Sequence, residues 1–243
     1  WDTLFDWDKK STVSGIVKPM GFTALWNPDT LYAELSEFIK NRTPSTKHLL
    51  ELALKGGVPI CSMISAGDIE TFDGPIIAAN TEYYSKELLD KLSSYTVAPM
   101  LLIGKKNPLS RKPDFTLSDG NDGFSTFFFN CPAIEGAKTL STVSKAVNTA
   151  FKDNHNGTWT SPLRYERPSA KFLKELKDTV DSLGLAPFSD NPECFIMAYY
   201  TSDRSAVLFV NNESYGAEDF KIKFPHKIKN ASAPTKSISY KLR

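Results

Sequence analysis

The sequence feature that most constrains the fold is a regular alternation of helical and strand patterns between Ser45 and Lys106. In order, the segment gives an amphipathic helix (STKHLLELALKGG), an apolar strand (VPICSMI) and a short acidic turn. A second apolar strand (GPIIAAN), a helix (SKELLDKLSSY) and a third strand (APMLLIGKK) follow. Alternating helices and strands joined by short connections favour a parallel sheet covered by helices. We therefore expect an α/β domain here.

Domains of this kind place a ligand or a nucleophile at the carboxyl ends of their strands. Here those ends read Ser65-Ala66-Gly67-Asp68, Asn80-Thr81-Glu82 and Gly104-Lys105-Lys106. None of the three has the pattern of a phosphate-binding glycine loop or of a nucleophile elbow. The segment therefore predicts the fold of this region, but no catalytic or ligand-binding motif.

The rest of the 243 residues divides around this segment. Residues 1–44 are an aromatic-rich lead-in with a short helix near Asp29–Lys40, and we interpret them as the possible end of a preceding domain. The α/β domain is expected over residues 45–188, and a small antiparallel β-domain over residues 189–243. Beyond Lys106, the patterns predict a strand at Phe124–Cys131, helices at Ser141–Lys152 and Ser169–Leu183, and strands at Glu193–Thr201, Ala206–Asn211, Phe220–Phe224 and Ser237–Leu242.

The charge balance gives no global field that would attract nucleic acid or an anionic membrane, because 29 Lys and Arg residues face 28 Asp and Glu residues. No apolar run approaches the roughly 20 residues that a membrane helix needs. We therefore expect a soluble protein with no nucleic-acid or membrane partner. Four N-x-Ser/Thr sequons, at Asn41, Asn156, Asn212 and Asn230, favour secretion slightly over a cytoplasmic location.

The three cysteines, Cys61, Cys131 and Cys194, are far apart and lack the spacing of a metal site. They lie in or beside apolar strand patterns, where a buried free thiol is the simplest interpretation. The three histidines, His48, His155 and His226, fall on a helix face or in loops. The sequence therefore assigns no catalytic residue. It also leaves the compartment open, since unpaired cysteines argue against secretion.

Two further patterns carry candidate ligand-binding residues. Asp119, Asn121 and Asp122 supply oxygen ligands at close spacing, which makes Ca²⁺ the one cofactor that the sequence raises. This loop lacks the closing Glu of an EF-hand, and a turn in which the Asx side chains bond their own backbone also explains it.

The second pattern is a set of aromatic and acidic residues suited to sugar contact, since sugar rings stack on aromatic side chains. The candidates are Trp1, Asp6, Trp7 and Trp26. The alternative is an acidic surface turn anchored by buried aromatic side chains.

The order of parts resembles the C-terminal region of TIM-barrel glycoside hydrolases and phosphorylases. The Lys-Pro-Met-Gly-Phe turn at residues 18–22 with Leu25-Trp26-Asn27 resembles the exit of a TIM-barrel glycosidase. Residues 45–106 are similar to the amidotransferase-like trimerisation domain of the β-galactosidase and galactosyl-hexosamine phosphorylase families. The strand AVLFVNNES is similar to the small β-domain that ends such enzymes. The resemblance implies a flavodoxin-like or amidotransferase-like parallel sheet flanked by helices, followed by the antiparallel β-domain.

The resemblance implies that a barrel carrying the two catalytic carboxylates lies upstream, so that no catalytic residue transfers to this chain. Working members of the class I glutamine amidotransferase-like fold carry a Cys in a glycine-flanked turn, and Gly104-Lys105-Lys106-Asn107-Pro108 has none. The role implied is a non-catalytic scaffold and oligomerisation region, with the upstream barrel or a second copy as partner. Two alternatives remain: a stand-alone module that binds carbohydrate or metal, and an α/β hydrolase whose site is assembled from dispersed residues.

Overall fold

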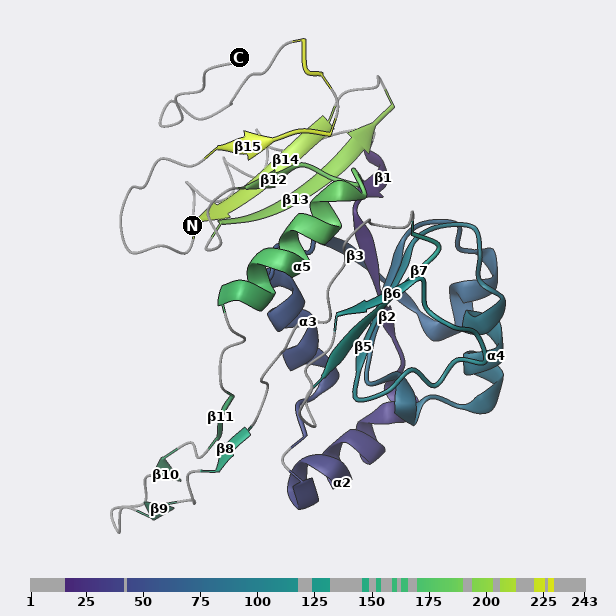
Figure 1. The fold of residues 1–243 in the computed structure, drawn as a ribbon, viewed down its shortest axis with the longest axis vertical. Helices are drawn as coiled ribbons and strands as arrows, with labels where there is room; N and C mark the ends of the chain where they lie inside the picture. The colour runs from purple at the N-terminus through teal and green to yellow at the C-terminus, as the bar shows by residue number, and fades with distance from the viewer. Residues whose placement is uncertain are drawn as a thin grey trace, which may run out of the picture.

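A computed structural model gives the fold of the chain (Figure 1). It describes residues 16–41, 43–117, 124–131, 146–148, 152–153, 159–160, 163–165, 170–189, 194–202, 206–212, 221–225 and 227–229. The predicted calcium loop, three of the four candidate sugar-contact residues and the predicted strand at Ser237–Leu242 lie outside these ranges.

The centre of the molecule is a six-stranded mixed sheet with the strand order β3-β2-β4-β5-β7-β6. Its strands, in chain order, are β2 (Phe22–Trp26), β3 (Ile60–Ser65), β4 (Ile76–Ala79), β5 (Met100–Gly104), β6 (Phe115–Leu117) and β7 (Ser125–Phe129). The four strands β2 to β5 are parallel, as the alternation of patterns predicts. The pairs β5–β7 and β6–β7 are antiparallel, so β7 runs against both of its neighbours while β6 has the same direction as β5. The expectation of a wholly parallel sheet is therefore wrong for this edge.

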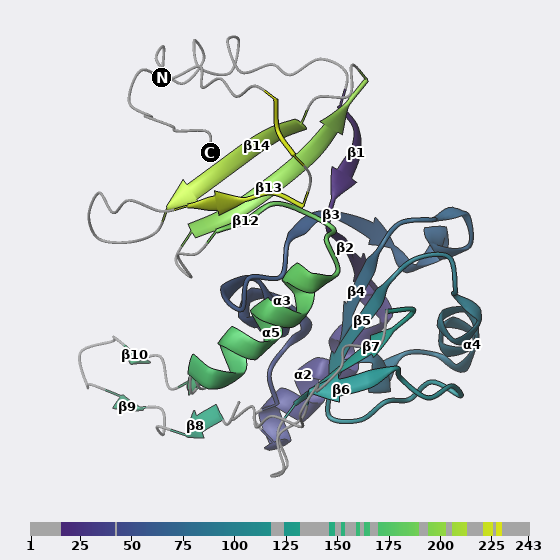
Figure 2. The ribbon, with the colours of Figure 1, turned by 45° about the horizontal axis from the view of Figure 1, so that its top comes forward.

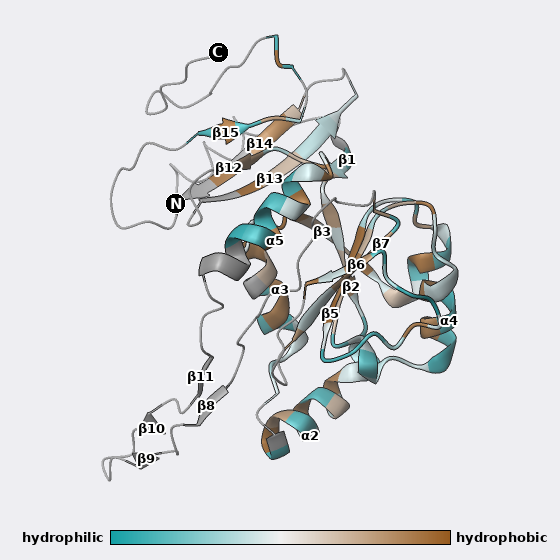
Figure 3. Ribbon diagram, in the orientation of Figure 1, coloured by the Kyte–Doolittle hydropathy of each residue, from teal (hydrophilic) through white to brown (hydrophobic). Residues whose placement is uncertain are grey.

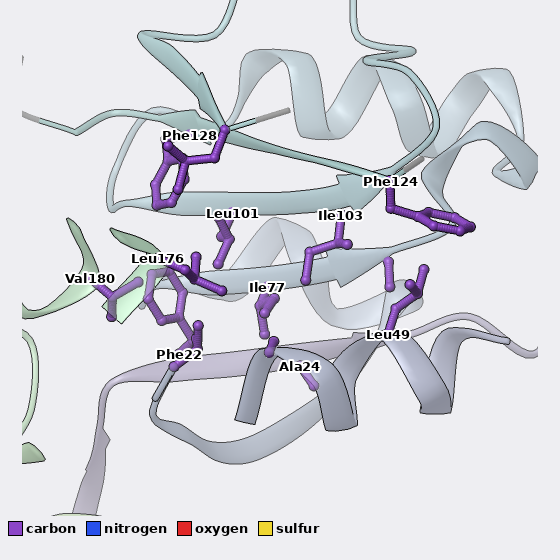
Figure 4. Close-up of a cluster of buried hydrophobic side chains, with 14 of the residues drawn as sticks. Phe22, Ala24, Leu49, Ile77, Leu101, Ile103, Phe124, Phe128, Leu176 and Val180 are labelled. Carbon is purple, nitrogen blue, oxygen red and sulfur yellow. The ribbon is translucent and has the colours of Figure 1, made fainter. Parts of the chain in front are cut away.

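Helices cover both faces of the sheet (Figures 1 and 2). The helices α3 (Thr46–Lys55) and α5 (Ala170–Ser182) lie on one face, and α4 (Lys86–Ser94) lies on the other. Figure 4 shows the first of the two cores, in which Leu49 of α3 and Leu176 of α5 pack against sheet residues such as Phe22 and Leu101. The second core joins α4 to the opposite side of the same strands. The described residues thus form an α/β/α arrangement.

The connection from β2 to β3 contains three helical segments before the chain enters the sheet again. These are the 3-10 helix η1 (Pro28–Thr30), α2 (Leu31–Asn41) and α3. The connection from β3 to β4 is the 3-10 helix η2 (Ala66–Thr71), and the 3-10 helix η3 (Thr81–Tyr83) precedes α4. The helices predicted near Asp29–Lys40 and Ser169–Leu183 are confirmed in α2 and α5.

A smaller antiparallel sheet has the order β1-β13-β14 and lies at the opposite end of the molecule from α2 (Figures 1 and 2). Its strands are β1 (Ile16–Met20), β13 (Cys194–Thr201) and β14 (Ala206–Asn212), and a second pair joins β12 (Phe188–Ser189) to β15 (Ile222–Lys223). The predicted antiparallel strands after residue 189 are confirmed in β13 and β14, and the predicted strand Phe220–Phe224 shortens to β15.

The extended run Ile16–Trp26 contributes a strand to each sheet, because β1 pairs with β13 and β2 lies between β3 and β4. Gly21 separates the two strands with φ of +109°, and a Cβ atom there would lie 2.6 Å from the Pro59 carbonyl oxygen. Only glycine combines that backbone conformation with that close approach. The central sheet therefore takes one of its inner strands from the segment that precedes residue 45.

The helix predicted at Ser141–Lys152 is wrong at the residues of that segment that the structure describes. Two short strands lie there instead, β8 (Ala146–Asn148) and β9 (Lys152–Asp153), and they pair with β11 (Leu163–Tyr165) and β10 (Trp159–Thr160) respectively. The sequence of this segment is rich in Val and Thr, whose branched side chains lose rotamer freedom in a helix and favour strands.

Candidate functional site

The candidate site lies at the carboxyl ends of the neighbouring strands β2 and β4. The chain leaves β2 toward β3 through helix α3 on one face, and leaves β4 toward β5 through helix α4 on the other face. The strand order therefore reverses between β2 and β4, and in open α/β sheets ligands bind outside the carboxyl ends of strands at such a switch point. We call the residues that follow the carboxyl ends of β2, β4 and β5, together with the facing residues of α2 and α3, the switch-point edge.

A buried carboxylate from α2 occupies this edge. Glu34 is 8% exposed, and it accepts hydrogen bonds from the Thr46 backbone N–H at 3.0 Å and the Thr30 hydroxyl at 3.2 Å. The Thr46 hydroxyl also donates to Glu34 Oε1. Because Thr46 is the first residue of α3, the carboxylate lies at the positive end of that helix and satisfies one of its unpaired N–H groups. The place where an anionic ligand would bind is filled by a side chain of the protein itself.

The carboxyl end of β4 is also closed, by a hydrogen bond from Asn80 to the segment that precedes α3. Asn80 adopts the left-handed conformation with φ of 52° and is fully buried, and its Nδ2 donates to the Pro44 carbonyl oxygen at 3.0 Å. Among the described residues, the buried Asn80 Oδ1, Thr81 Oγ1 and Tyr84 Oη atoms have no hydrogen-bond partner. The edge thus combines backbone strain with unmet polar groups, as functional sites often do.

Glu82 follows these residues and faces the carboxyl end of β5. Its Oε1 accepts a hydrogen bond from the Lys105 backbone N–H at 3.3 Å, and a Cβ atom on Gly104 would lie 2.5 Å from Oε2. Burial raises the pKa of Glu82, while its backbone hydrogen bonds and the lysines beside it, Lys105 and Lys106, oppose that rise. The Lys105 ammonium donates to the Thr43 hydroxyl at 3.1 Å. The strand ends that the sequence singled out, at residues 80–82 and 104–105, therefore do meet in space.

Burial also raises the pKa of two tyrosines at the edge. For Tyr83 the pKa rises to about 12, since burial and the nearby Glu82 carboxylate disfavour its anion while a hydrogen bond with Thr43 opposes the rise. For Tyr84 burial is again the main cause, and the carboxylates of Glu34 and Glu82 act in the same direction. Both phenols are therefore neutral near pH 7, so neither is an activated base or nucleophile.

Of the candidate sugar-contact residues, only Trp26 lies in the described part of the chain. It is the last residue of β2, and 37% of its surface is exposed at the switch-point edge. Trp1, Asp6 and Trp7 lie outside the described residues, as do the candidate calcium ligands Asp119, Asn121 and Asp122. Within the described ranges, no group of three or more His, Cys, Asp and Glu side chains is arranged to hold a metal ion.

Cys61 and Cys131 are buried free thiols, as the sequence predicts. Cys61 is the second residue of β3, away from the switch-point edge, and its thiol donates to the Met20 carbonyl oxygen at 2.9 Å. Burial raises the pKa of Cys61, and burial together with the Asp114 carboxylate raises that of Cys131 to about 12. Neither thiol has the lowered pKa of an activated nucleophile. Cys194 lies in β13, in the small sheet.

Sequence reasoning missed Glu34 and Thr46 as members of the edge. Glu34 has the pattern of an exposed position, since it stands between Leu31 and Leu35 in a helix whose apolar stripe would ordinarily face the core. The start of α3 at Thr46 was predicted from the Ser-Thr pair at residues 45–46, but no signal in the sequence indicates that Thr46 bonds a carboxylate from α2.

The described fold and edge define a mixed α/β protein with a helix-covered central sheet and small antiparallel sheets. Comparison with known proteins gives no match to a family profile, to a curated protein or to a solved structure. Among the described helices, none has the length and apolar character needed to cross a bilayer.

Proposed function

We propose that this chain is a non-catalytic scaffold and oligomerisation region of a carbohydrate-active enzyme, with a flavodoxin-like or amidotransferase-like sheet. The parallel strands β2 to β5 in the order β3-β2-β4-β5, with helices on both faces, support that finer fold assignment. The parent class, a glycoside hydrolase or phosphorylase, comes from the resemblance of the sequence, and the upstream barrel is the catalytic partner it implies.

The observation that carries the proposal is the filled switch-point edge. Glu34 occupies the positive end of α3, and Thr46 joins that carboxylate to the end of β4, where its hydroxyl lies 3.5 Å from the Ala79 carbonyl oxygen. Lys105, which follows β5, is held by Thr43. A site built to bind and release substrate keeps such groups available, whereas here Glu34 and Lys105 bond protein groups, and the atoms of the edge that have no partner are buried. The fold is retained while its usual ligand position serves to hold α2 and α3 in place.

The test combines activity assays with sedimentation of the chain. The proposal predicts no turnover of any aryl glycoside, no phosphorolysis of disaccharides and no glutaminase activity, together with a multimer in analytical ultracentrifugation. Glu34→Ala serves as the matched variant, since removing the carboxylate frees the edge and should not create activity if the parent barrel carries the chemistry. Hydrolysis by this chain alone would overturn the proposal.

Sugar binding is a second candidate function, and the exposure of Trp26 at the switch-point edge favours it. An exposed indole at this position offers a flat apolar surface for a sugar ring. Isothermal titration with a panel of oligosaccharides tests it: binding that Trp26→Ala removes, by a chain that sediments as a monomer, would favour a stand-alone module over the scaffold.

A further inference from the structure

Arg111 has a guanidinium group that the protein bonds only in part. The residue lies in the connection between β5 and β6, which is largely hydrophilic, whereas β5 itself is apolar (Figure 3). Its Nη1 atom donates to Asn130 Oδ1 at 3.0 Å. Its Nε and Nη2 atoms are buried and have no hydrogen-bond partner among the described residues. Two donors of a charged group are therefore shielded from water without an acceptor, which is costly for a folded protein.

The two unpaired nitrogens form the edge of the guanidinium that is suited to an oxyanion. In the planar arginine side chain, the Nε–H bond and one Nη2–H bond point in the same direction, while Nη1 lies on the other side of the group. Two parallel donors of this kind match two oxygens of a carboxylate or a phosphate in a bidentate pair. We call the Nε and Nη2 atoms of Arg111 the Arg111 fork.

The contacts of Arg111 hold the fork in a fixed orientation. The guanidinium carbon lies 4.8 Å from the centroid of the buried Phe129 ring, and the bond to Asn130 fixes its rotation. Asn130 is itself held in place, because its Nδ2 donates to the carbonyl oxygens of Tyr95 at 3.1 Å and Ala98 at 2.8 Å. A side chain fixed in this way loses little conformational freedom when a ligand binds.

The fork lies at the opposite end of the central sheet from the switch-point edge. Asn130 follows β7, whose last residue, Phe129, pairs with Met100, the first residue of β5. Arg111 is therefore beside the amino end of β5, whereas the switch-point edge is formed at the carboxyl ends of the strands. The fork thus plays no part in closing that edge, and the scaffold role does not depend on it.

An acidic side chain, that of Asp114, lies near Arg111 but bonds elsewhere. Burial lowers the pKa of Arg111, and the Asp114 carboxylate opposes that change. The Asp114 Oδ2 atom accepts a hydrogen bond from the Cys131 backbone N–H at 2.9 Å. The next residue along the chain from Arg111 is Lys112, an exposed cation. The neighbouring charges therefore leave the fork without an anion of its own among the described residues.

We propose that the Arg111 fork binds an oxyanion, namely a phosphate or carboxylate group of a small molecule. Parallel hydrogen bonds to two of its oxygens satisfy both buried donors and compensate the buried charge. A purely structural role needs only the bond to Asn130 and leaves the fork unexplained. Arg111 as a whole is partly exposed, so the guanidinium lies close below the surface, and the ligand displaces the side chains that cover the fork.

The experiment is titration of the full chain with inorganic phosphate and, separately, with acetate, at constant ionic strength. Nuclear magnetic resonance follows the Arg111 Nε–H signal, assigned through the backbone signals of the same residue. We expect the signal to shift and to saturate with a Kd of about 1 mM, the affinity expected of a few charge-assisted hydrogen bonds. Saturation by phosphate alone identifies a phosphate ligand, saturation by acetate alone identifies a carboxylate ligand, and saturation by both supports a general oxyanion site. An Nε–H signal that neither anion moves would overturn the proposal.

Two variants with the same change of charge separate the fork from general electrostatic attraction. Arg111→Gln removes the fork and should weaken anion binding at least about tenfold, measured on the backbone amide signals of residues 105–114. The matched control, Lys112→Gln, removes the exposed charge beside it and should weaken binding less than about twofold. Arg111→Lys keeps the charge but loses the parallel donors, so binding should again weaken about tenfold.

Circular dichroism verifies that each variant is folded. Equal weakening by Arg111→Gln and Lys112→Gln would show that the anion responds to surface charge alone, and the role of the fork would be refuted. If neither Arg111 variant folds, the titration of the wild-type Nε–H signal decides the question by itself, because it reports directly on the fork.

Discussion

Replacement of Glu34 by alanine should show how strongly the filled switch-point edge holds the fold together. The carboxylate accepts from the Thr46 N–H, the Thr46 hydroxyl and the Thr30 hydroxyl. After its removal the Thr30 hydroxyl keeps the Asn27 carbonyl oxygen at 2.9 Å, and the Thr46 hydroxyl can turn to the Ala79 carbonyl oxygen. The Thr46 N–H, at the start of α3, is the group left with no partner.

The expected cost follows from that one group. A lost charge-assisted hydrogen bond and an unpaired buried N–H together cost about 2–3 kcal/mol of unfolding free energy, after allowing for relief of the buried charge. For a chain of this size that corresponds to a fall in Tm of about 5–10 °C. Glu34→Gln keeps a carbonyl acceptor for the N–H, so about 1 kcal/mol is expected.

Urea unfolding followed by circular dichroism measures the effect, with Glu51→Gln as the control. Glu51 is an exposed residue of α3 that forms an ion pair with Lys47, with 3.7 Å between Nζ and Oε1, so its loss should cost less than about 0.5 kcal/mol. If Glu34→Ala matched this control, the carboxylate would not hold α2 and α3 at the edge, and the reasoning about a filled site would fail.

Two further predictions concern buried groups. In a Cys194→Ser variant, Cys61 and Cys131 should resist iodoacetamide at pH 8 while the protein is folded, because burial keeps both thiols protonated. Both should react fully in urea, and rapid labelling of the folded protein would contradict their buried position. Gly21→Ala should cost more than about 2 kcal/mol in unfolding free energy, since both the backbone conformation and the space exclude a side chain. Gly67→Ala, with no side-chain atom closer than 3.8 Å to the new Cβ, should change it by less than about 1 kcal/mol, and equal effects would refute the strain argument.

The central sheet could be predicted where the chain alternates short apolar strands with amphipathic helices. The strands β4 and β5 are continuous apolar runs buried along their whole length, as strands covered on both faces must be, whereas β3 at the edge of the sheet alternates buried and exposed positions. The strand β2 was harder, because Phe22–Trp26 stands in an irregular, aromatic-rich segment with no helical pattern before it. The antiparallel direction of β7 depends on how the chain turns back after β6, and the periodicity of a strand does not encode its direction.

The position of the switch-point edge could be predicted from the sequence, but the residues of α2 that occupy it could not. Strand ends at residues 80–82 and 104–105 follow from the α/β pattern, and they do meet through Glu82 and the Lys105 N–H. The role of Glu34 did not follow, since the apolar positions of α2 predict the opposite face as buried. A helix whose tertiary contacts oppose its amphipathic pattern defeats sequence reasoning, because the pattern is the only signal of which face is buried.

The bend at Gly21 affects how cooperatively the two sheets unfold. Because one extended run supplies a strand to both sheets, any displacement of the small sheet is transmitted along an unbroken backbone into β2, at the middle of the large one. The bond from the Tyr199 hydroxyl to the Cys61 carbonyl oxygen, at 2.6 Å, adds a second link between β13 and β3. Under denaturant the two sheets should therefore melt in a single transition, and proteolysis should find no intermediate in which either survives alone.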